Sequence, residues 1–338
     1  PLVGRSVDRR GGRVVLSAGS LLGAGAMALL ACASGPATLM AGWALAGAAM
    51  SACLYDPAFA TLAQHMAAAR FRKAVTLITI LGGFASTVFW PVSQLMLDTW
   101  GWRTAFGVYA GLHLLVCLPI HLLVIPDLTR AVTADAATAI GPTASAPPRR
   151  GLGWLTVAVG AASFVSSVIA VHAVSLLVAQ GLTQAQAIWI AMLIGPMQVA
   201  GRIAEFGFAS RIGVVALGRV AFALMIVAAL AILAIEGFGI AAFVFVVAFG
   251  WGNGLFTIVR GTAPAELFGR VDLGALLGHL ARAGLYSRAL APASFSGMLA
   301  VGLTRNAALA TLAVVALGAL ASYSLAVRGA RAGKSGQN

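Results

Sequence analysis

Long apolar segments recur along the whole chain, and they restrict its fold more than any other feature. A helix needs about 20 predominantly apolar residues to cross a bilayer. The pattern therefore predicts an all-α polytopic membrane protein with about ten transmembrane helices. The ten segments, separated by short polar or glycine- and proline-containing turns, are Val14–Ala33, Thr38–Leu62, Ala74–Leu97, Thr104–Ile125, Leu152–Ala179, Ala185–Ala209, Val214–Ile235, Ile240–Val259, Leu273–Val301 and Ala307–Val327.

The composition agrees with this class and excludes a large water-soluble domain. Hydrophobic residues make up 60% of the chain and charged residues only 9%, whereas soluble proteins carry about 25% charged residues. Cys32, Cys53 and Cys117 lie inside apolar segments without paired spacing. They are typical of small core residues rather than of a disulfide framework or a metal site. The sequence contains no phosphate-binding loop, nucleophile elbow or zinc spacing, so we expect no cofactor and no metal.

The basic residues lie almost entirely on one side of the predicted membrane. The net charge is +13, from 22 Lys and Arg against 9 Asp and Glu. With the opening segment in the cytoplasm, only Arg103 and Arg305 fall in loops on the opposite side, and Arg202, Arg282 and Arg288 fall within apolar segments. Such a bias sets orientation and attracts loops to anionic lipids. We expect a monomer in a bacterial inner membrane, in contact with the lipid bilayer and with no nucleic acid.

One long connection divides the chain. Residues 126–151 are rich in Ala, Thr and Pro, a composition that cannot support a packed core and is typical of a flexible linker. We therefore expect a partial N-terminal helical bundle at residues 1–125, a cytoplasmic linker at 126–151, a six-helix bundle at 152–328 and a cytoplasmic tail at 329–338.

A glycine- and arginine-containing motif lies in the polar loop that opens the chain. Its residues are Gly4, Asp8, Arg9, Gly11 and Arg13. Their spacing resembles the G-x-x-x-D-R-x-G-x-R/K signature of the major facilitator superfamily, which lies in the cytoplasmic loop between that family's second and third helices. The resemblance implies that ten of twelve helices are present, that the two preceding ones are absent and that the linker follows the sixth.

The resemblance also implies a function. The family moves small solutes by alternating access, driven by a proton or another ion, and its signature loop acts as a conformational latch between the two halves. Gly201-Arg202 is similar to the monocarboxylate-transporter-like branch, whereas Leu81–Ser86 lacks the G-P-x-x-G-G pattern of drug antiporters. We expect a transporter of a small solute, such as an organic anion, and no enzyme. The alternatives are multidrug or toxic-compound efflux, a non-transporting membrane sensor and a membrane-embedded enzyme.

Asp8 of this motif has two kinds of candidate partner. Its carboxylate can accept hydrogen bonds from neighbouring arginines, or it can lie at the positive N-terminus of a helix. The alternative to a latch is a basic loop that only sets topology.

Asp56 is the first ionisable candidate inside the apolar segments. Charged residues at such depth cost at least about 2.5–3.5 kcal/mol and are functional candidates by default. Asp56 shares a small-residue face with Gly42, Ala46 and Ala49, and Pro57 is expected to kink the helix beside it. It is either a proton- or substrate-binding residue or part of a structural ion pair.

Two further polar stripes lie in the second half. Arg202 and Glu205 are three residues apart and can pair with each other, although an arginine also suits a carboxylate substrate. Asn253 lies among alternating glycines from Gly250 to Gly254. The glycines predict one of two arrangements: a gating bend, with Asn253 lining a cavity, or close helix packing, with Asn253 hydrogen-bonded to another helix.

The segment after residue 272 carries the last candidates. His279, Arg282 and Tyr286 share one helical face, and Arg288 points away from it. A cation at this depth requires water, a counter-ion or an anionic ligand. We therefore expect Arg282 to favour an anionic substrate, the alternative being that both arginines serve only packing.

Overall fold

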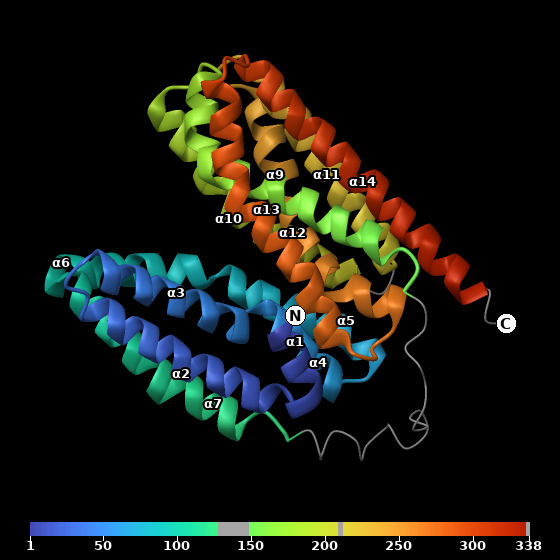
Figure 1. Ribbon diagram of the computed structural model, residues 1–338. Helices are drawn as coiled ribbons and strands as arrows, with labels where there is room; N and C mark the ends of the chain where they lie inside the picture. The colour runs from blue at the N-terminus through green and yellow to red at the C-terminus, as the bar shows by residue number, and fades with distance from the viewer. Residues whose placement is uncertain (128–148, 209–211, 336–338) are drawn as a thin grey trace. The chain divides into compact units, whose positions relative to one another are not determined.

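The computed structural model describes residues 1–127, 149–208 and 212–335 (Figure 1). Every regular element in these ranges is a helix, and they contain no strand, which confirms the all-α fold class. The earlier helices are α1 (Leu2–Arg10), α2 (Gly12–Ala31), α3 (Pro36–Cys53), α4 (Tyr55–His65), α5 (Ala68–Gly83), α6 (Ala85–Leu112), η1 (His113–Cys117) and α7 (Leu118–Leu123). The later helices are α9 (Leu152–Ala179), α10 (Gln184–Phe208), α11 (Val214–Leu233), α12 (Ile240–Phe268), α13 (Leu273–Ala300) and α14 (Arg305–Ser335).

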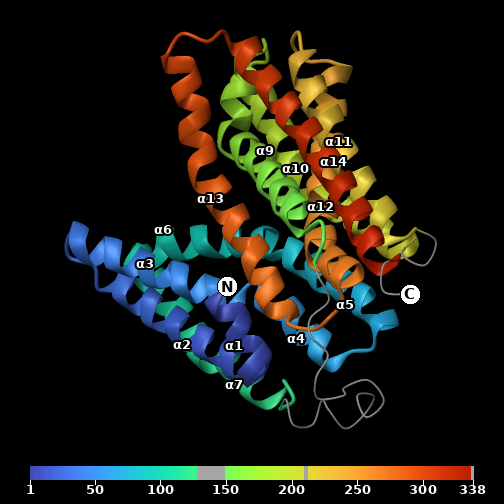
Figure 2. The ribbon, with the colours of Figure 1, turned by 45° about the vertical axis from the view of Figure 1, so that its right-hand side comes forward.

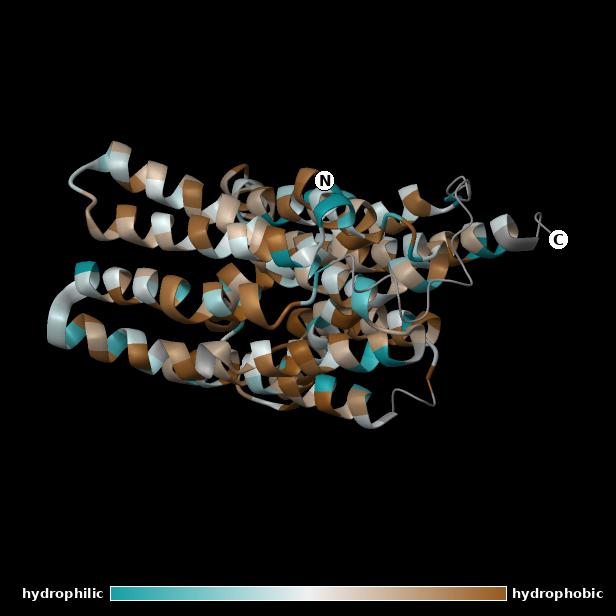
Figure 3. Cartoon of the chain, turned by 90° about the horizontal axis from the view of Figure 1, so that it is seen from below, coloured by the Kyte–Doolittle hydropathy of each residue, from teal (hydrophilic) through white to brown (hydrophobic). Residues whose placement is uncertain are grey.

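Eight helical stretches of the described residues are long and apolar enough to cross a membrane, and Figure 3 shows hydrophobic residues over most of their length. Two of the ten predicted segments are helical but are not among the eight. Ala74–Leu97 is divided between α5 and α6. Leu273–Val301 corresponds to α13, whose His279, Arg282 and Arg288 lower its hydropathy. That these two segments also span the membrane stays a prediction. The eight are Gly12–Ala31, Pro36–His65, Pro91–Leu123, Leu152–Ala179, Gln184–Gly207, Val214–Leu233, Ile240–Phe268 and Arg305–Gly333.

The expectation of a loop at the start of the chain is wrong, because the segment forms the helix α1. Val3 and Val7 are one helical turn apart, and Val7 is fully buried. The polar residues Arg5 and Arg9 lie on the exposed side. Apolar burial on one face therefore makes this polar segment helical.

The contacts divide the chain into two compact units, and each is described by itself. Unit 1 comprises Pro1–Ala74, Phe84–Ser145 and Arg270–Gly278. Unit 2 comprises Val75–Gly83, Ala146–Gly269 and His279–Asn338. The beginning of α13 therefore packs in unit 1, and the end of α5 packs in unit 2. The predicted linker at 126–151 falls for the most part outside the described residues.

The core of unit 1 is built around α2, which packs against α3, α6 and α7 (Figure 1). Small residues allow this close packing: a Cβ atom at Gly19 would lie 3.0 Å from the backbone of Ala52. Ser20 and Ala24 on α2 are also buried. Gly101, with φ 79° and ψ 166°, interrupts the helical backbone of α6.

The core of unit 2 is formed by α9, α10, α11, α12 and α14, with α11 beside both α12 and α14 (Figure 2). Its aromatic centre includes Phe222 and Tyr323, whose ring centroids lie 5.0 Å apart. The Tyr323 hydroxyl donates to the carbonyl of Val214 at 3.3 Å. This buried hydroxyl is satisfied, as a polar group in an apolar core must be.

Candidate functional site

Asp8 lies at the N-terminus of α13, within unit 1. Its Oδ1 accepts a hydrogen bond from the backbone N–H of Gly274 at 2.8 Å, and its Oδ2 accepts one from Ala275 at 2.7 Å. The first N–H groups of a helix have no partner within the helix and carry partial positive charge. Of the two partners considered from the sequence for Asp8, the structure therefore shows the helix N-terminus.

Glycines let α1 and α13 approach at this point. A Cβ atom at Gly4 would overlap the carbonyl oxygen of Gly274, and one at Gly274 would lie 2.7 Å from Oδ1 of Asp8. A Cβ atom at Gly278 would lie 2.9 Å from Pro1. The two backbones touch. Gly4 is therefore required because a larger side chain would not fit, and not because of its backbone conformation.

Gly11 ends α1 with a conformation that other residues rarely adopt. Its φ is 81° and its ψ is 159°, and its N–H donates to the carbonyl of Val7 at 2.9 Å. The Val7 carbonyl also accepts from Nε2 of Gln64 at 2.8 Å. Left-handed φ values favour glycine, which explains this motif position.

The motif arginines have different surroundings. Arg13 forms an ion pair with Asp127 at 2.7 Å, in which both side chains are partly exposed. Arg9 is exposed on α1. The structure therefore places Gly4 and Asp8 at the α1–α13 junction. Gly11 lies at the end of α1, and Arg13 is paired with Asp127.

A second junction of unit 1 was not singled out from the sequence. Nη1 of Arg270, in the turn before α13, donates to the carbonyl of Met66 at 2.7 Å. Its guanidinium carbon lies 4.8 Å from the ring centre of Phe71. Burial lowers the pKa of Arg270 from its ordinary value. A loop arginine carries no sequence signal for a partner some 200 residues earlier.

Asp56 lies in the first turn of α4, where it is half-buried. The expected continuous face from Gly42 to Asp56 is interrupted, because Leu54 is extended, with φ −85° and ψ −162°, and separates α3 from α4. Pro57 lies within the first turn of α4, where proline is tolerated. The carboxylate thus lies near a helix N-terminus.

Arg202 and Glu205 are buried in unit 2, with 5% and 4% of their surfaces exposed. Nη1 of Arg202 donates to the carbonyl of Thr79 at 2.8 Å. Oε2 of Glu205 accepts from Oγ1 of Thr76 at 2.6 Å. Both partners lie on the end of α5, which the sequence did not indicate.

The same cluster continues from Arg202 toward α12. A Cβ atom at Gly83 would lie 2.7 Å from Nη1 of Arg202. Nη2 of Arg202 lies 3.5 Å from Oγ1 of Thr257, which donates to the carbonyl of Asn253 at 3.0 Å. Polar groups of α5, α10 and α12 are therefore joined in one buried cluster.

Asn253 is bonded across helices: its Oδ1 accepts from Oγ of Ser166 on α9 at 3.0 Å. Gly250 and Gly254 face α10, and a Cβ atom at either would overlap Met197 or Gln198. The α12 helix is continuous through this stretch. Of the two readings of these glycines, the structure shows close packing.

His279, Arg282 and Tyr286 project from α13. His279 is half-buried, and Arg282 and Tyr286 are exposed. Within the described residues no hydrogen bond or ion pair holds the Arg282 guanidinium. Arg288 is also exposed, and its backbone carbonyl accepts a hydrogen bond from Oγ of Ser167 at 2.9 Å.

No group of three or more His, Cys, Asp and Glu that could hold a metal occurs in the part of the chain described.

One family model, described as Major Facilitator Superfamily, matches residues 1–246. No protein of curated function matches the sequence. Among solved structures, human organic anion transporter MFSD10 (TETRAN) has a TM-score of 0.74 at 16% identity, over 96% of this chain and 79% of that one.

Two structures of FucP are also similar. A variant of the E. coli fucose:proton symporter has a TM-score of 0.66 at 13% identity, over 96% of this chain and 86% of that one. FucP in the outward conformation has a TM-score of 0.72 at 14% identity, with coverages of 96% and 85%. At these identities the likeness shows the fold, in agreement with the resemblance of the opening motif.

Proposed function

This chain belongs to the major facilitator superfamily, and from that premise we propose that it moves a small organic anion across the membrane by alternating access. Secondary transport of a small solute follows from the family. The anionic substrate and the mechanism are our proposal, supported by the charges of the second half.

The observation that carries the anionic substrate is the exposed guanidinium of Arg282. It lies nine residues, or about 13 Å, into α13, and no acid of the described residues pairs with it. If α13 spans the membrane, as its sequence predicts, a cation at this depth is costly unless water or an anionic ligand compensates it. His279 and Tyr286 on the same face add hydrogen-bonding groups for a carboxylate. The similar MFSD10 is described as an organic anion transporter.

The coupling ion in this proposal is the proton. Asp56 is half-buried and Glu205 is buried, so either carboxylate changes its interactions when it binds a proton. The similar E. coli protein is described as a fucose:proton symporter. Arg202 and Asn253 line the buried cluster around Glu205 and are the remaining candidates for substrate or proton binding.

The α1–α13 junction is the latch of this mechanism. Asp8 holds the start of α13 by two hydrogen bonds to backbone N–H groups, and these groups can be released without breaking a covalent constraint. Breaking and remaking the contact would bias the exchange between outward- and inward-facing states. The motif residues Gly4, Asp8, Arg9, Gly11 and Arg13 then act as one unit.

The family fold and the spans support an integral membrane protein. For its topology we propose bundles at residues 1–125 and 152–328, with the linker at 126–151 and the tail at 329–338 in the cytoplasm. The bias of basic residues supports this orientation, and a bacterial inner membrane is the proposed location.

Transport in proteoliposomes tests the proposal. A labelled small monocarboxylate should accumulate under an imposed proton gradient, and an uncoupler should abolish this uptake. Arg282→Gln should lower the rate at least about tenfold, the loss expected for one charge-assisted hydrogen bond, and Arg288→Gln should lower it less. Full activity in both variants, or uptake of cations only, would contradict an anionic substrate.

A further inference from the structure

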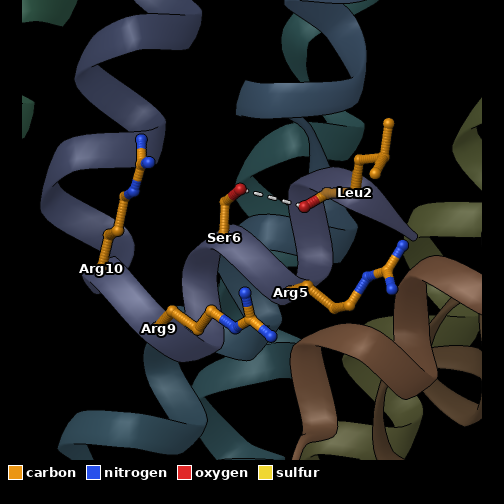
Figure 4. Close-up of a pocket in the computed structure, with 5 residues that line it drawn as sticks. All are labelled: Leu2, Arg5, Ser6, Arg9 and Arg10. Carbon is orange, nitrogen blue, oxygen red and sulfur yellow. Dashed lines mark hydrogen bonds between the residues drawn. The ribbon is translucent and has the colours of Figure 1, made fainter.

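A small basic pocket lies on α1, apart from the residues proposed to bind substrate. Its volume is about 350 Å³, and Leu2, Arg5, Ser6, Arg9 and Arg10 line it. Figure 4 shows Arg5 on one turn of the helix and Arg9 and Arg10 on the next, with Ser6 between them and the three side chains extending in different directions. The Ser6 hydroxyl donates to the carbonyl of Leu2 at 3.0 Å.

The charge of this pocket is not neutralised by the described residues. Arg5, Arg9 and Arg10 have no hydrogen bond or ion pair in the described ranges, whereas the neighbouring Arg13 pairs with Asp127. Arg5 and Arg9 are four residues apart, a spacing at which like charges on a helix repel. An anion in the pocket would relieve this repulsion.

The place of the pocket indicates which anion. The helix α1 directly precedes α2, the first apolar span, so its arginines lie at the level of lipid headgroups. Leu2, with 75% of its surface exposed, adds an apolar side chain beside them. Clusters of four to eight basic residues next to a span are typical of anionic-lipid binding, and the opening segment carries four, the three pocket arginines and Arg13. The guanidinium fork matches phosphate oxygens.

We propose that this pocket binds the phosphate of an anionic phospholipid headgroup. The site is independent of the transported solute, because none of the residues on α13 or α10 that are proposed to bind substrate lines it. Failure of the lipid proposal would leave the proposed transport unaffected.

Lipid binding to the purified chain in detergent tests this directly, with phosphatidylglycerol, phosphatidylcholine and inorganic phosphate as separate probes. The Arg5→Gln/Arg10→Gln variant should bind phosphatidylglycerol about 20- to 30-fold more weakly than the parent, from the contribution of each arginine near a membrane surface. Arg150→Gln/Arg328→Gln removes the same charge from two other exposed arginines and should retain the parental affinity.

Three results would overturn the proposal. Equal loss in both double variants would mean attraction by net charge alone. Equal binding of phosphatidylcholine would mean that the phosphate of an anionic lipid is not selected. Displacement of phosphatidylglycerol by millimolar inorganic phosphate, with loss of phosphate binding in Arg5→Gln/Arg10→Gln, would mean a soluble phosphate as ligand. If that variant fails to fold, Arg5→Lys/Arg10→Lys keeps the charge but loses the fork, and unchanged affinity in it would reject the geometric argument.

Discussion

Asp8 accepts a hydrogen bond from the backbone N–H of Gly274, a residue 266 positions later in the chain, at 2.8 Å. A second bond from Ala275, at 2.7 Å, occupies the other carboxylate oxygen. An ionised carboxylate suits both donors, because each oxygen only accepts. The aspartate of the opening motif therefore caps the N-terminus of α13.

Asp8→Asn should weaken the junction without preventing membrane insertion. The amide keeps one accepting oxygen but turns an NH₂ group toward a backbone donor, so we expect a loss of about 1–2 kcal/mol and slower transport. Uptake rate and cysteine accessibility from both sides of the membrane measure the effect. Asp127→Asn removes only a partly exposed ion pair and should cost at most about 1 kcal/mol. Unchanged rate and accessibility in Asp8→Asn would reduce the motif to a topology signal.

Gly4→Ala should destabilise unit 1 because its methyl group would overlap the carbonyl oxygen of Gly274. Overpacking of this kind costs about 1–3 kcal/mol, measurable as a lower midpoint of thermal unfolding in detergent. Gly47→Ala on α3 is the matched control, since no atom lies within 4 Å of the added Cβ. Equal midpoints for the two variants would show that the α1–α13 contact relaxes freely.

Thr76→Val should destabilise the buried cluster of unit 2. It removes the donor to Glu205 and leaves a buried carboxylate oxygen with one bond fewer, at a cost of about 1–3 kcal/mol. Thr156→Val serves as control, because Oγ1 of Thr156 donates only to the carbonyl of Leu152 within its own helix. The difference between their thermal midpoints measures the contribution of the bond to Glu205. Equal midpoints would argue against a structural role for Glu205.

Arg270→Gln should cost about 1–2 kcal/mol, from the lost bond to Met66 and the lost cation–π contact with Phe71. Arg270→Lys keeps the charge and should recover part of the lost stability. Arg150→Gln, at an exposed site, should be nearly neutral. Chemical denaturation of the three variants measures this order, and a neutral Arg270→Gln would make the junction incidental.

Protease should reach the linker from one side only. In inside-out vesicles we expect cleavage between residues 126 and 151, because the distribution of basic residues places this segment in the cytoplasm. Intact right-side-out cells should be resistant there. Cleavage only from the outer face would reverse the orientation.

Local sequence patterns were sufficient for the fold class and for most of the membrane helices. Apolar segment length predicts membrane helices without knowledge of their partners, and the spacing from Gly4 to Arg13 indicates the family. The helix N-terminus was one of two partners considered for Asp8, because a carboxylate is stabilised either by cationic side chains or by backbone N–H groups.

Long-range partners could not be predicted in the same way. Nothing local in Thr76, Thr79 or Arg270 distinguishes them from other helical threonines or loop arginines, since their partners lie more than 100 residues away in sequence. The break at Leu54 was missed because Pro57 was the stronger local signal. The π-helical turn at His113–Cys117 was missed as well, since its residues are apolar and helix-compatible like those around them.

The bond between Asp8 and Ala275 is insensitive to most substitutions of Ala275. Its donor is a peptide N–H group, which every residue except proline carries. Replacing Ala275 by another residue therefore leaves the donor in place, and a search for pairs of positions that change together would find little here. At residue 275 the donor is lost only with proline, or with an ester in place of the amide. Substitution can alter this contact at residue 8, and at Gly4 and Gly274, where an added Cβ atom would meet the opposite segment.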